Sequence, residues 1–299
     1  MNMDSINFIN INRNQSENIR YNFNDLPFYF HKGHFSMYPN YSMQEHWHDD
    51  IELILILSGN MTYNINGKLI KFNEGEGIII NSHQLHAAFS SPMQECEYIV
   101  ILFHPMILCS IKQYEQEFVL PFINSSHDFI HLKPSVDWQS EIIRLINCIA
   151  EKIHNKTSAF TTIGILHLIW SEIIEHINIE PQSKVSNLQL STLKNMISFI
   201  HSHYSEKITL ADISQAGHIS KRTCGNLFFT YLYKTPIEFL NDYRLKKSIE
   251  LMQNTDMTIL EIALACGFSG SSYYAETFRK RFGKSPTEYK LKKSKNLFS

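Results

Sequence analysis

The chain has 299 residues, 43% of them hydrophobic, and a formal net charge of −2, which is enough chain for two globular domains that each bury a core. Its five cysteines have no close paired spacing, so neither a disulfide framework nor a zinc knuckle is suggested. The longest apolar stretches, IELILIL and IGILHLIW, are far shorter than the about 18 to 20 residues of a membrane span. The first twenty residues lack the basic start and apolar run of a secretion signal, so we expect a soluble, cytoplasmic protein.

The net charge hides an uneven division of charges along the chain. Residues 191–299 hold 16 Lys or Arg and 9 Asp or Glu, whereas the remaining residues hold 11 and 20. A basic region suits the phosphate backbone of a nucleic acid, and an acidic one does not. The alternative is a basic surface that faces solvent alone.

The first half of the chain begins with an Asn-rich segment and continues with short strands. Residues 1–24 form either an ordered arm that folds over a neighbouring domain or a frayed terminus. From 25 to 135, β-rich runs alternate with turn signals, and Asn66-Gly67 marks a two-residue hairpin. The expected strands are 51–57, 61–65, 68–72, 78–80 and 98–103. This spacing predicts a small β-barrel or a double-sheet jelly roll, which encloses a cavity where its interior is not fully packed.

Two amphipathic helices are predicted next, at 136–155 and 158–178. The connection between them is short, so they should run antiparallel. They either pack on the barrel or build a dimer interface. Residues 181–190, polar and interrupted by Pro181, are the expected linker to the last domain.

The last third contains an internal repeat. The segment TLADISQAGHIS (209–220) aligns with TILEIALACGFS (258–269), and one residue of insertion later Phe228 pairs with Phe278 and Pro236 with Pro286. Each copy has a helix cap, an apolar stripe and then a second short helix, which predicts two helix-turn-helix units. Residues 236–252 read as one amphipathic helix that holds the two units at a fixed spacing.

At these residues the chain resembles the AraC family of transcriptional regulators. The resemblance covers about residues 193–289, and its best-matched phrases are RLKKSIELMQNTDMTILEIALACGFSGSSYY and FRKRFGKSPTEY. It implies an α+β chain whose last domain, 191–292, is all-α and binds double-stranded promoter DNA. It also favours a homodimer formed through 136–180, because sensing domains of this family often pair through such helices.

The phrase HWHDDIELILILSGNMTYNINGKLIKFNEGEGIIINSHQLH resembles the cupin-like sensing domain common in the same family. In metal-binding cupins the first motif reads His-x-His, three or four residues, a Glu and a later Gly. His46, His48, Glu52 and Gly59 fit that spacing. Residues two apart in a strand share a face, so the first three side chains are expected to point into one cavity.

The match to the second cupin motif is weaker, because the stretch near Gly75 runs into Ile78 where another His is expected. His83 and His86 follow later. The histidines therefore bind a metal, contact an effector, or are simply satisfied by hydrogen bonds. We predict a small-molecule effector site and assign no metal, cofactor or catalytic residue. Its expected residues are His46, His48, Glu52 and His86.

The second helix of each unit is the one expected to face DNA. Cys224, Leu227 and Phe228 should point inward, and in the second copy Tyr273, Tyr274, Thr277 and Phe278 recur at helical spacing. The side chains expected at the DNA are Lys221, Arg222, Gly225, Asn226, Ser271, Ser272, Glu276, Arg279 and Lys280.

These positions have different expected roles. Arg222 suits guanine and Asn226 adenine, while Lys221, Arg279 and Lys280 suit phosphates; the alternative for Lys280 is a solvated surface. Three departures from the family pattern stand out. Gly225 offers a base no side chain, Asn226 and Glu276 occupy a position that is often Arg, and Tyr233 stands where Gly is usual.

The expected function is therefore a DNA-binding transcriptional regulator, most often an activator acting on RNA polymerase. One alternative is a cupin metalloenzyme with a regulatory tail. Another is a regulator whose barrel is structural and binds no ligand.

Overall fold

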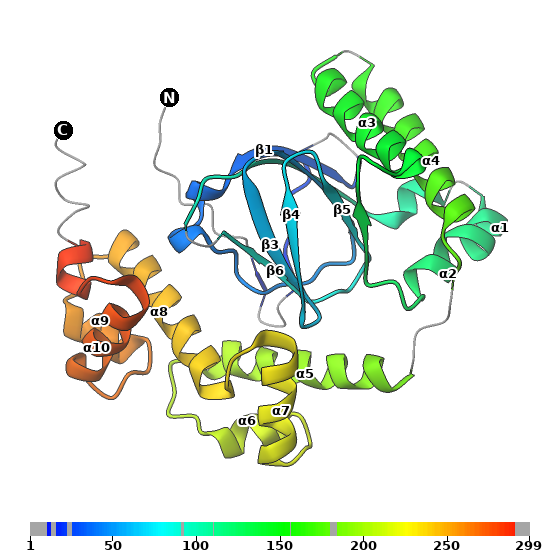
Figure 1. Cartoon of the computed structure of the whole chain (residues 1–299). Helices are drawn as coiled ribbons and strands as arrows, with labels where there is room; N and C mark the ends of the chain where they lie inside the picture. The colour runs from blue at the N-terminus through cyan, green and yellow to red at the C-terminus, as the bar shows by residue number, and fades with distance from the viewer. Residues whose placement is uncertain are drawn as a thin grey trace, which may run out of the picture. The chain divides into compact units, whose positions relative to one another are not determined.

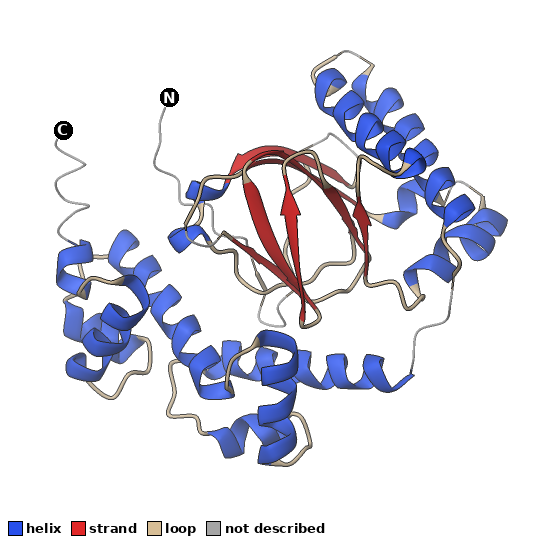
Figure 2. Ribbon diagram, in the orientation of Figure 1, coloured by secondary structure: helices blue, strands red, loops and turns tan. Residues whose placement is uncertain are grey.

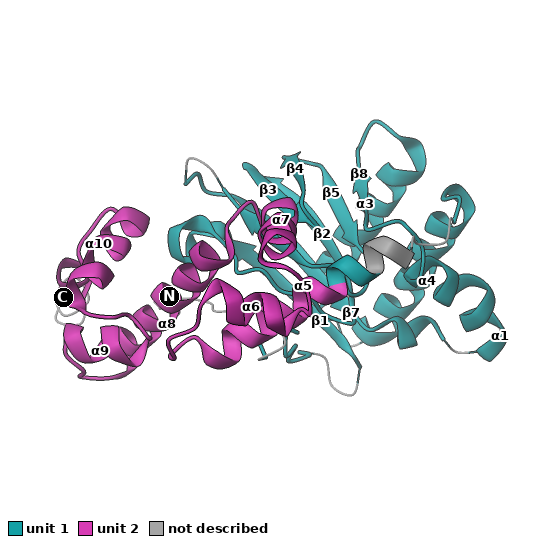
Figure 3. Cartoon of the chain, turned by 90° about the horizontal axis from the view of Figure 1, so that it is seen from below, with its two compact units in different colours: residues 1–190 teal, residues 191–299 magenta. Residues whose placement is uncertain are grey.

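The computed structural model describes residues 11–12, 16–22, 26–90, 93–109, 111–155, 157–179 and 184–290, with the backbone alone for 184–187. The chain divides into two compact units, residues 1–190 and residues 191–299 (Figure 3). Unit 1 contains the strands, and the described part of unit 2 is helical (Figure 2). The predicted α+β class is confirmed.

Unit 1 is built from two antiparallel sheets (Figure 1). The larger has the order β1-β7-β2-β5-β8 and the smaller the order β4-β3-β6. Among the described residues these sheets do not join into a closed ring, so the jelly-roll alternative holds and the closed barrel does not. The strands are β1 (Phe28–His34), β2 (Ile51–Ser58), β3 (Asn60–Ile65), β4 (Lys68–Asn73), β5 (Gly77–Ile80), β6 (His86–Phe89), β7 (Glu97–Phe103) and β8 (Phe129–Leu132).

Strand β2 lies in the middle of the larger sheet and is buried on both faces. Side chains alternate along a strand, so Leu53 and Leu55 join the core cluster shared with the helices, while Ile54 and Ile56 join the cluster between the two sheets. Glu52 has the same parity as Ile54. The alternation therefore carries a carboxylate into the interior between the sheets.

Helical segments cover one side of the larger sheet. Their main members, α3 (Asp137–Lys152) and α4 (Ser158–His176), are the two predicted helices, and they share a core cluster with the sheet. Strand β8 and the short helices between β7 and β8 were not predicted. Those helices are η3 (Pro105–Leu108), α1 (Lys112–Tyr114), η4 (Glu115–Val119) and α2 (Leu120–Ile123), and two further turns, η1 (Phe35–Met37) and η2 (Pro39–Tyr41), follow β1.

Part of the Asn-rich arm lies against the sheets. The Glu17 N–H donates to the Trp47 carbonyl at 2.8 Å, and the Tyr21 hydroxyl donates to Oδ1 of Asp50 at 2.9 Å. Residues 1–10, 13–15 and 23–25 of the predicted arm and its surroundings lie outside the described residues. The described part of the arm is therefore ordered over unit 1.

Unit 2 contains the repeat, and α5 precedes it. The helices are α5 (Lys184–His203), α6 (Leu210–Ala216), α7 (Lys221–Leu232), α8 (Pro236–Asn254), α9 (Ile259–Ala265) and α10 (Ser271–Phe282). The predicted linker, 181–190, is helical from Lys184 onward, because α5 begins before the expected residue 191. The first three linker residues lie outside the described part of the chain.

The two copies begin their first helices with the same cap. In α6 the Thr209 side chain accepts from the Asp212 N–H, and Asp212 reaches back to the Thr209 N–H. Thr258 and Glu261 make the same reciprocal pair in α9. Such a box satisfies two of the backbone donors that a helix start leaves without partners. The helix starts predicted from the repeat are confirmed.

Candidate functional site

Four predicted effector residues come together in the interior of unit 1. His46 and His48 precede β2, Glu52 lies in it, and His86 begins β6. The backbones of His46 and His86 exchange two hydrogen bonds of 2.9 Å, which places residues forty positions apart side by side. All four side chains are buried, with 2% to 3% of each residue exposed.

The three imidazole rings have the same hydrogen-bonding arrangement. Nδ1 of His46, His48 and His86 lies 2.9 Å from the carbonyl oxygen of Gln44, Asp50 and Gln84, respectively. A carbonyl can only accept, so each Nδ1 carries its proton and donates it. In a neutral ring the other nitrogen, Nε2, then presents a lone pair.

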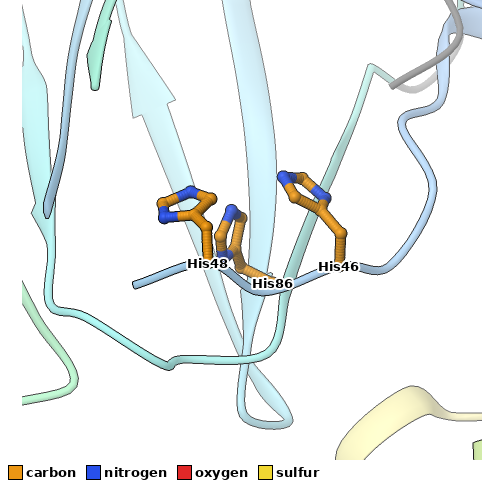
Figure 4. A group of neighbouring side chains, drawn as sticks. All are labelled: His46, His48 and His86. Atoms are coloured by element: carbon orange, nitrogen blue, oxygen red, sulfur yellow. The ribbon is translucent and has the colours of Figure 1, made fainter. Parts of the chain in front are cut away.

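The rings gather on the same side of the chain (Figure 4). The ring centroids of His46 and His86 are 4.2 Å apart, and those of His48 and His86 are 5.0 Å apart. One nitrogen from each ring lies within 4.8 Å of the other two. Because every Nδ1 is engaged with a carbonyl, the nitrogens facing one another are the Nε2 atoms.

Glu52 adds a carboxylate to the three rings. Its Oε2 lies 2.9 Å from Nε2 of His86 and 3.4 Å from Nε2 of His48. Burial would raise the pKa of Glu52, but the His86 and His48 rings outweigh it and hold that pKa well below its usual value. The carboxylate is therefore ionised. The Tyr63 hydroxyl donates to the other oxygen, Oε1, at 3.4 Å.

The two motif histidines have opposite electrostatic settings. Burial would lower the pKa of His48, but the Glu52 carboxylate, 3.4 Å from its Nε2, raises that pKa to about 9. Burial and the neighbouring His86 and His48 rings lower the pKa of His46 well below its usual value. His46 is therefore neutral near pH 7, whereas the Glu52 carboxylate favours a second proton on His48 where nothing else binds its Nε2.

A cavity of about 180 Å³ opens beside this cluster between the sheets. His46 and Glu52 line it, whereas His48 and His86 do not belong to its wall. Of the four predicted effector residues, two therefore line the cavity and two do not. The other lining residues are Glu17, Asn18, Ile19, Arg20, Tyr29, His31, Tyr38, Met43, Ile54, Tyr63, Tyr98, Val100 and Leu102.

Several of these lining residues were not predicted. Glu17 and Arg20 come from the arm, and Oε2 of Glu17 lies 3.5 Å from Nε2 of His46. Burial is the main cause that raises the pKa of Glu17 to about 7. The Tyr98 hydroxyl donates a hydrogen bond to the Tyr38 hydroxyl at 3.2 Å. No local pattern in the sequence indicates them, because they come from segments far apart along the chain.

His83 follows the second motif together with His86, but the structure places it away from the cluster. Its ring is 54% exposed, and Nδ1 lies 3.1 Å from Oδ1 of Asp49. His83 therefore belongs to the surface, and His86 is the histidine that faces the cluster.

The predicted DNA-facing residues lie on the outer faces of α7 and α10. Cys224, Leu227 and Phe228 are buried under α7, and Tyr274 and Phe278 are buried under α10, as expected. The outer side chains Lys221, Arg222, Asn226, Ser271, Ser272, Glu276, Arg279 and Lys280 are exposed, and Gly225 is half-buried. Each second helix therefore has a polar outer face and an inner face that is buried in the core.

Two family models match this chain. The AraC-like ligand binding domain matches residues 31–160, and the helix-turn-helix domain matches residues 213–292. The transcriptional regulator YdeC of Bacillus subtilis is 31% identical over 288 residues, which cover 95% of this chain and 98% of YdeC. The chain belongs to the AraC family of transcriptional regulators, with a ligand-binding domain and a helix-turn-helix domain.

Other relatives are more distant. The transcriptional activator RhaR of Mannheimia succiniciproducens is 24% identical over 247 residues, covering 82% of this chain and 86% of RhaR. The crystal structure of ToxT from Vibrio cholerae is 16% identical and has a TM-score of 0.42, covering 88% of this chain and 97% of ToxT. Within the described residues, no helix is both long and apolar enough to cross a membrane.

Proposed function

We propose that this chain regulates transcription by binding promoter DNA through α7 and α10 and a small-molecule effector in the cavity of unit 1. The observation that carries the DNA half of the proposal is the duplicated outer face: each second helix leaves polar side chains in solvent above a buried aromatic core. A major groove admits such a helix, and side chains on its outer face reach base edges and phosphates.

The two outer faces have different proposed roles. Arg222 and Asn226 on α7 read guanine and adenine, since their side chains can each make a pair of hydrogen bonds to one of these bases. Arg279 and Lys280 at the end of α10 hold phosphates, together with Lys221. The net positive charge of residues 191–299 supports this proposal because phosphate contacts dominate affinity for DNA.

The proposed effector lies among His46, Glu52 and the tyrosines of the cavity. A cavity whose wall combines charged and hydroxyl groups with aliphatic side chains can hold and orient a small ligand. The ionised Glu52 and the four cavity tyrosines offer an acceptor and several hydroxyl groups. The class of ligand that fits is a small molecule with polar groups rather than a long hydrocarbon.

We further propose that the protein is a homodimer in the cytoplasm, activates through RNA polymerase and has no enzymatic role. Exposed apolar side chains on the helical segment of unit 1 support dimerisation: Phe160 and Leu168 of α4 are 84% and 56% exposed. RhaR, a relative over most of the chain, is a transcriptional activator. This similarity supports the proposal that the present protein is an activator as well.

The test is genome-wide DNA occupancy of the intact protein and of an Arg222→Ala/Arg279→Ala variant. We expect discrete promoter sites that the double variant loses. Lys207→Ala is the matched control, since Lys207 is an exposed basic residue of unit 2 outside both second helices, and its sites should remain. Sites retained by the double variant would refute the proposed interface.

A further inference from the structure

We propose that His46, His48, His86 and Glu52 bind one divalent first-row transition-metal ion, such as Zn²⁺, Fe²⁺ or Co²⁺. The inference deepens the proposed effector site and rests on it for its regulatory meaning. It revises the expectation that this domain holds no metal. Its basis is the arrangement of four buried side chains rather than the spacing of a motif.

The three imidazole rings are held in one orientation by the backbone. Three separate backbone carbonyls accept from the three Nδ1 groups, each at 2.9 Å. This turns the three Nε2 atoms, rather than the Nδ1 atoms, toward the centre of the cluster. Metal-binding histidines almost always donate their second ring nitrogen in this way, because the contact sets the tautomer and fixes the ring. A histidine packed for its own hydrogen bonds has no need for this repeated arrangement.

The distances between the polar atoms of the cluster match those between ligands of one metal ion. Two atoms bound to one ion at about 2.1 Å lie about 3.0 Å apart at a right angle and about 3.4 Å apart at the tetrahedral angle. Oε2 of Glu52 lies 2.9 Å from Nε2 of His86 and 3.4 Å from Nε2 of His48. The three ring nitrogens lie within 4.8 Å of one another. The spacing of Glu52, His86 and His48 therefore fits one ion, and the His46 ring, with a nitrogen within 4.8 Å of the other two rings, supplies the fourth ligand.

Buried polar atoms at the centre of the cluster lack hydrogen bonds. Nε2 of His48, Nε2 of His86 and Oε2 of Glu52 are all buried without a hydrogen bond of acceptable geometry. Leaving such atoms unsatisfied in the interior destabilises the folded state. A proton on one ring satisfies one of these contacts, whereas a divalent ion satisfies every lone pair at the centre. Three imidazoles and one carboxylate suit zinc, iron, cobalt or nickel better than magnesium or calcium.

The position of the cluster connects the ion to sensing. His46 and Glu52 belong both to the four ligands and to the wall of the 180 Å³ cavity. Coordination positions not taken by the protein would face this cavity. An effector with oxygen or nitrogen donors would then bind the ion directly, and the ion would become part of the recognition surface.

The experiment uses the full chain, stripped of metal with a chelator and titrated with Co²⁺ or Zn²⁺ alone. Metal content after dialysis gives the stoichiometry, and the visible absorption of Co²⁺ reports its ligands. We expect one ion per chain. Loss of a residue that only supports a metal ligand weakens metal binding by about 10- to 100-fold. His86→Ala and Glu52→Gln change ligands themselves, so each should weaken metal binding at least as much. His34→Ala is the matched control, since His34 is an exposed histidine of the same unit, and it should bind like the parent.

Far-UV circular dichroism checks that each variant folds, and Glu52→Gln, which preserves the shape of the side chain, decides the question if His86→Ala does not. The inference is overturned if the parent takes up no ion, or if His86→Ala and Glu52→Gln bind it as tightly as His34→Ala. DNA binding is measured on the same samples. Metal uptake without DNA binding refutes the proposed regulator, whereas DNA binding without metal uptake refutes the metal site alone.

Discussion

The second helices of the two helix-turn-helix units share a buried phenylalanine on their inner faces and differ on their outer faces. Phe228 and Phe278 are both fully buried, and each packs on an aromatic ring of the helix that follows it in the repeat. On the outside, Arg222 of α7 corresponds to Ser272 of α10, and Asn226 to Glu276. Packing restricts the inner positions, whereas the outer ones are free to diverge.

The ends of the second helices differ as well. Both α7 and α10 end in a left-handed residue, which is Tyr233 (φ 54°) in the first unit and Gly283 (φ 68°) in the second. Only glycine adopts this conformation without steric cost. The first unit therefore contains backbone strain that the second avoids. Ser220 caps α7 with its side chain, whereas Gly270 before α10 makes no such bond. The duplication preserved the shape of the unit and not the residues that achieve it.

The largest expected effect tests whether the two inner faces are equivalent. Phe228→Ala and Phe278→Ala should each destabilise unit 2 by about 3 to 5 kcal/mol, because each leaves a cavity in a packed core. Chemical denaturation of the full chain, with amide hydrogen exchange of α7 and α10, measures the change. Phe229→Ala is the control, since Phe229 is 63% exposed and should change stability by less than about 0.5 kcal/mol. A loss confined to one unit would show that the cores are not equivalent.

The next effect sharpens the difference between the outer faces. On a bound operator, Arg222→Ala should cost about 1 to 3 kcal/mol, or about 5- to 150-fold in affinity, and relax the preference at one base. Arg279→Ala should weaken binding to all sequences alike and lower the salt dependence by about one phosphate contact. Affinity measured over a series of salt concentrations and operator variants separates the two. Equal changes in sequence preference for both variants would contradict the assigned roles.

A smaller effect concerns the two helix ends. Tyr233→Gly should stabilise unit 2 by about 1 kcal/mol, because it removes the cost of a left-handed non-glycine residue. Gly283→Ala should destabilise it by a similar amount, although an added Cβ meets nothing within 4 Å. Thermal and chemical unfolding measure both. Tyr233→Ala keeps the strain and removes the ring, so stabilisation by this variant would assign the effect to the side chain instead.

The smallest expected effect is at the middle of α7. Gly225→Ala should stabilise the helix by about 0.5 to 1 kcal/mol, since glycine has the greater backbone entropy and nothing lies within 4 Å of an added Cβ. The corresponding residue of α10 is Ala275, and Ala275→Gly should have the opposite sign. Unfolding midpoints of the two variants provide the measurement. Lower stability of Gly225→Ala would indicate that this glycine is needed for packing.

The helical unit could be predicted in much more detail than the strand unit. The caps at Thr209 and Thr258, the inner residues and the long connecting helix all follow from contacts between residues a few positions apart. The five expected strands are present, but β1, β6 and β8 were not predicted individually, and the predicted linker is helical from Lys184. Short strands with partners distant in the chain have weak local signals.

The sequence by itself determined the repeat, its caps and cores and the family of the chain, and it predicted that His46, His48 and Glu52 come together, although His46 and His48 precede the strand that holds Glu52. These features depend on the periods of helices and strands, which act over a few residues. Only the tertiary structure decided that His86 and not His83 joins the cluster, that the sheets stay open, and that the arm and four tyrosines line a cavity. Those outcomes depend on strand register and on pairing between distant segments such as 46 and 86, and local periodicity does not specify either one.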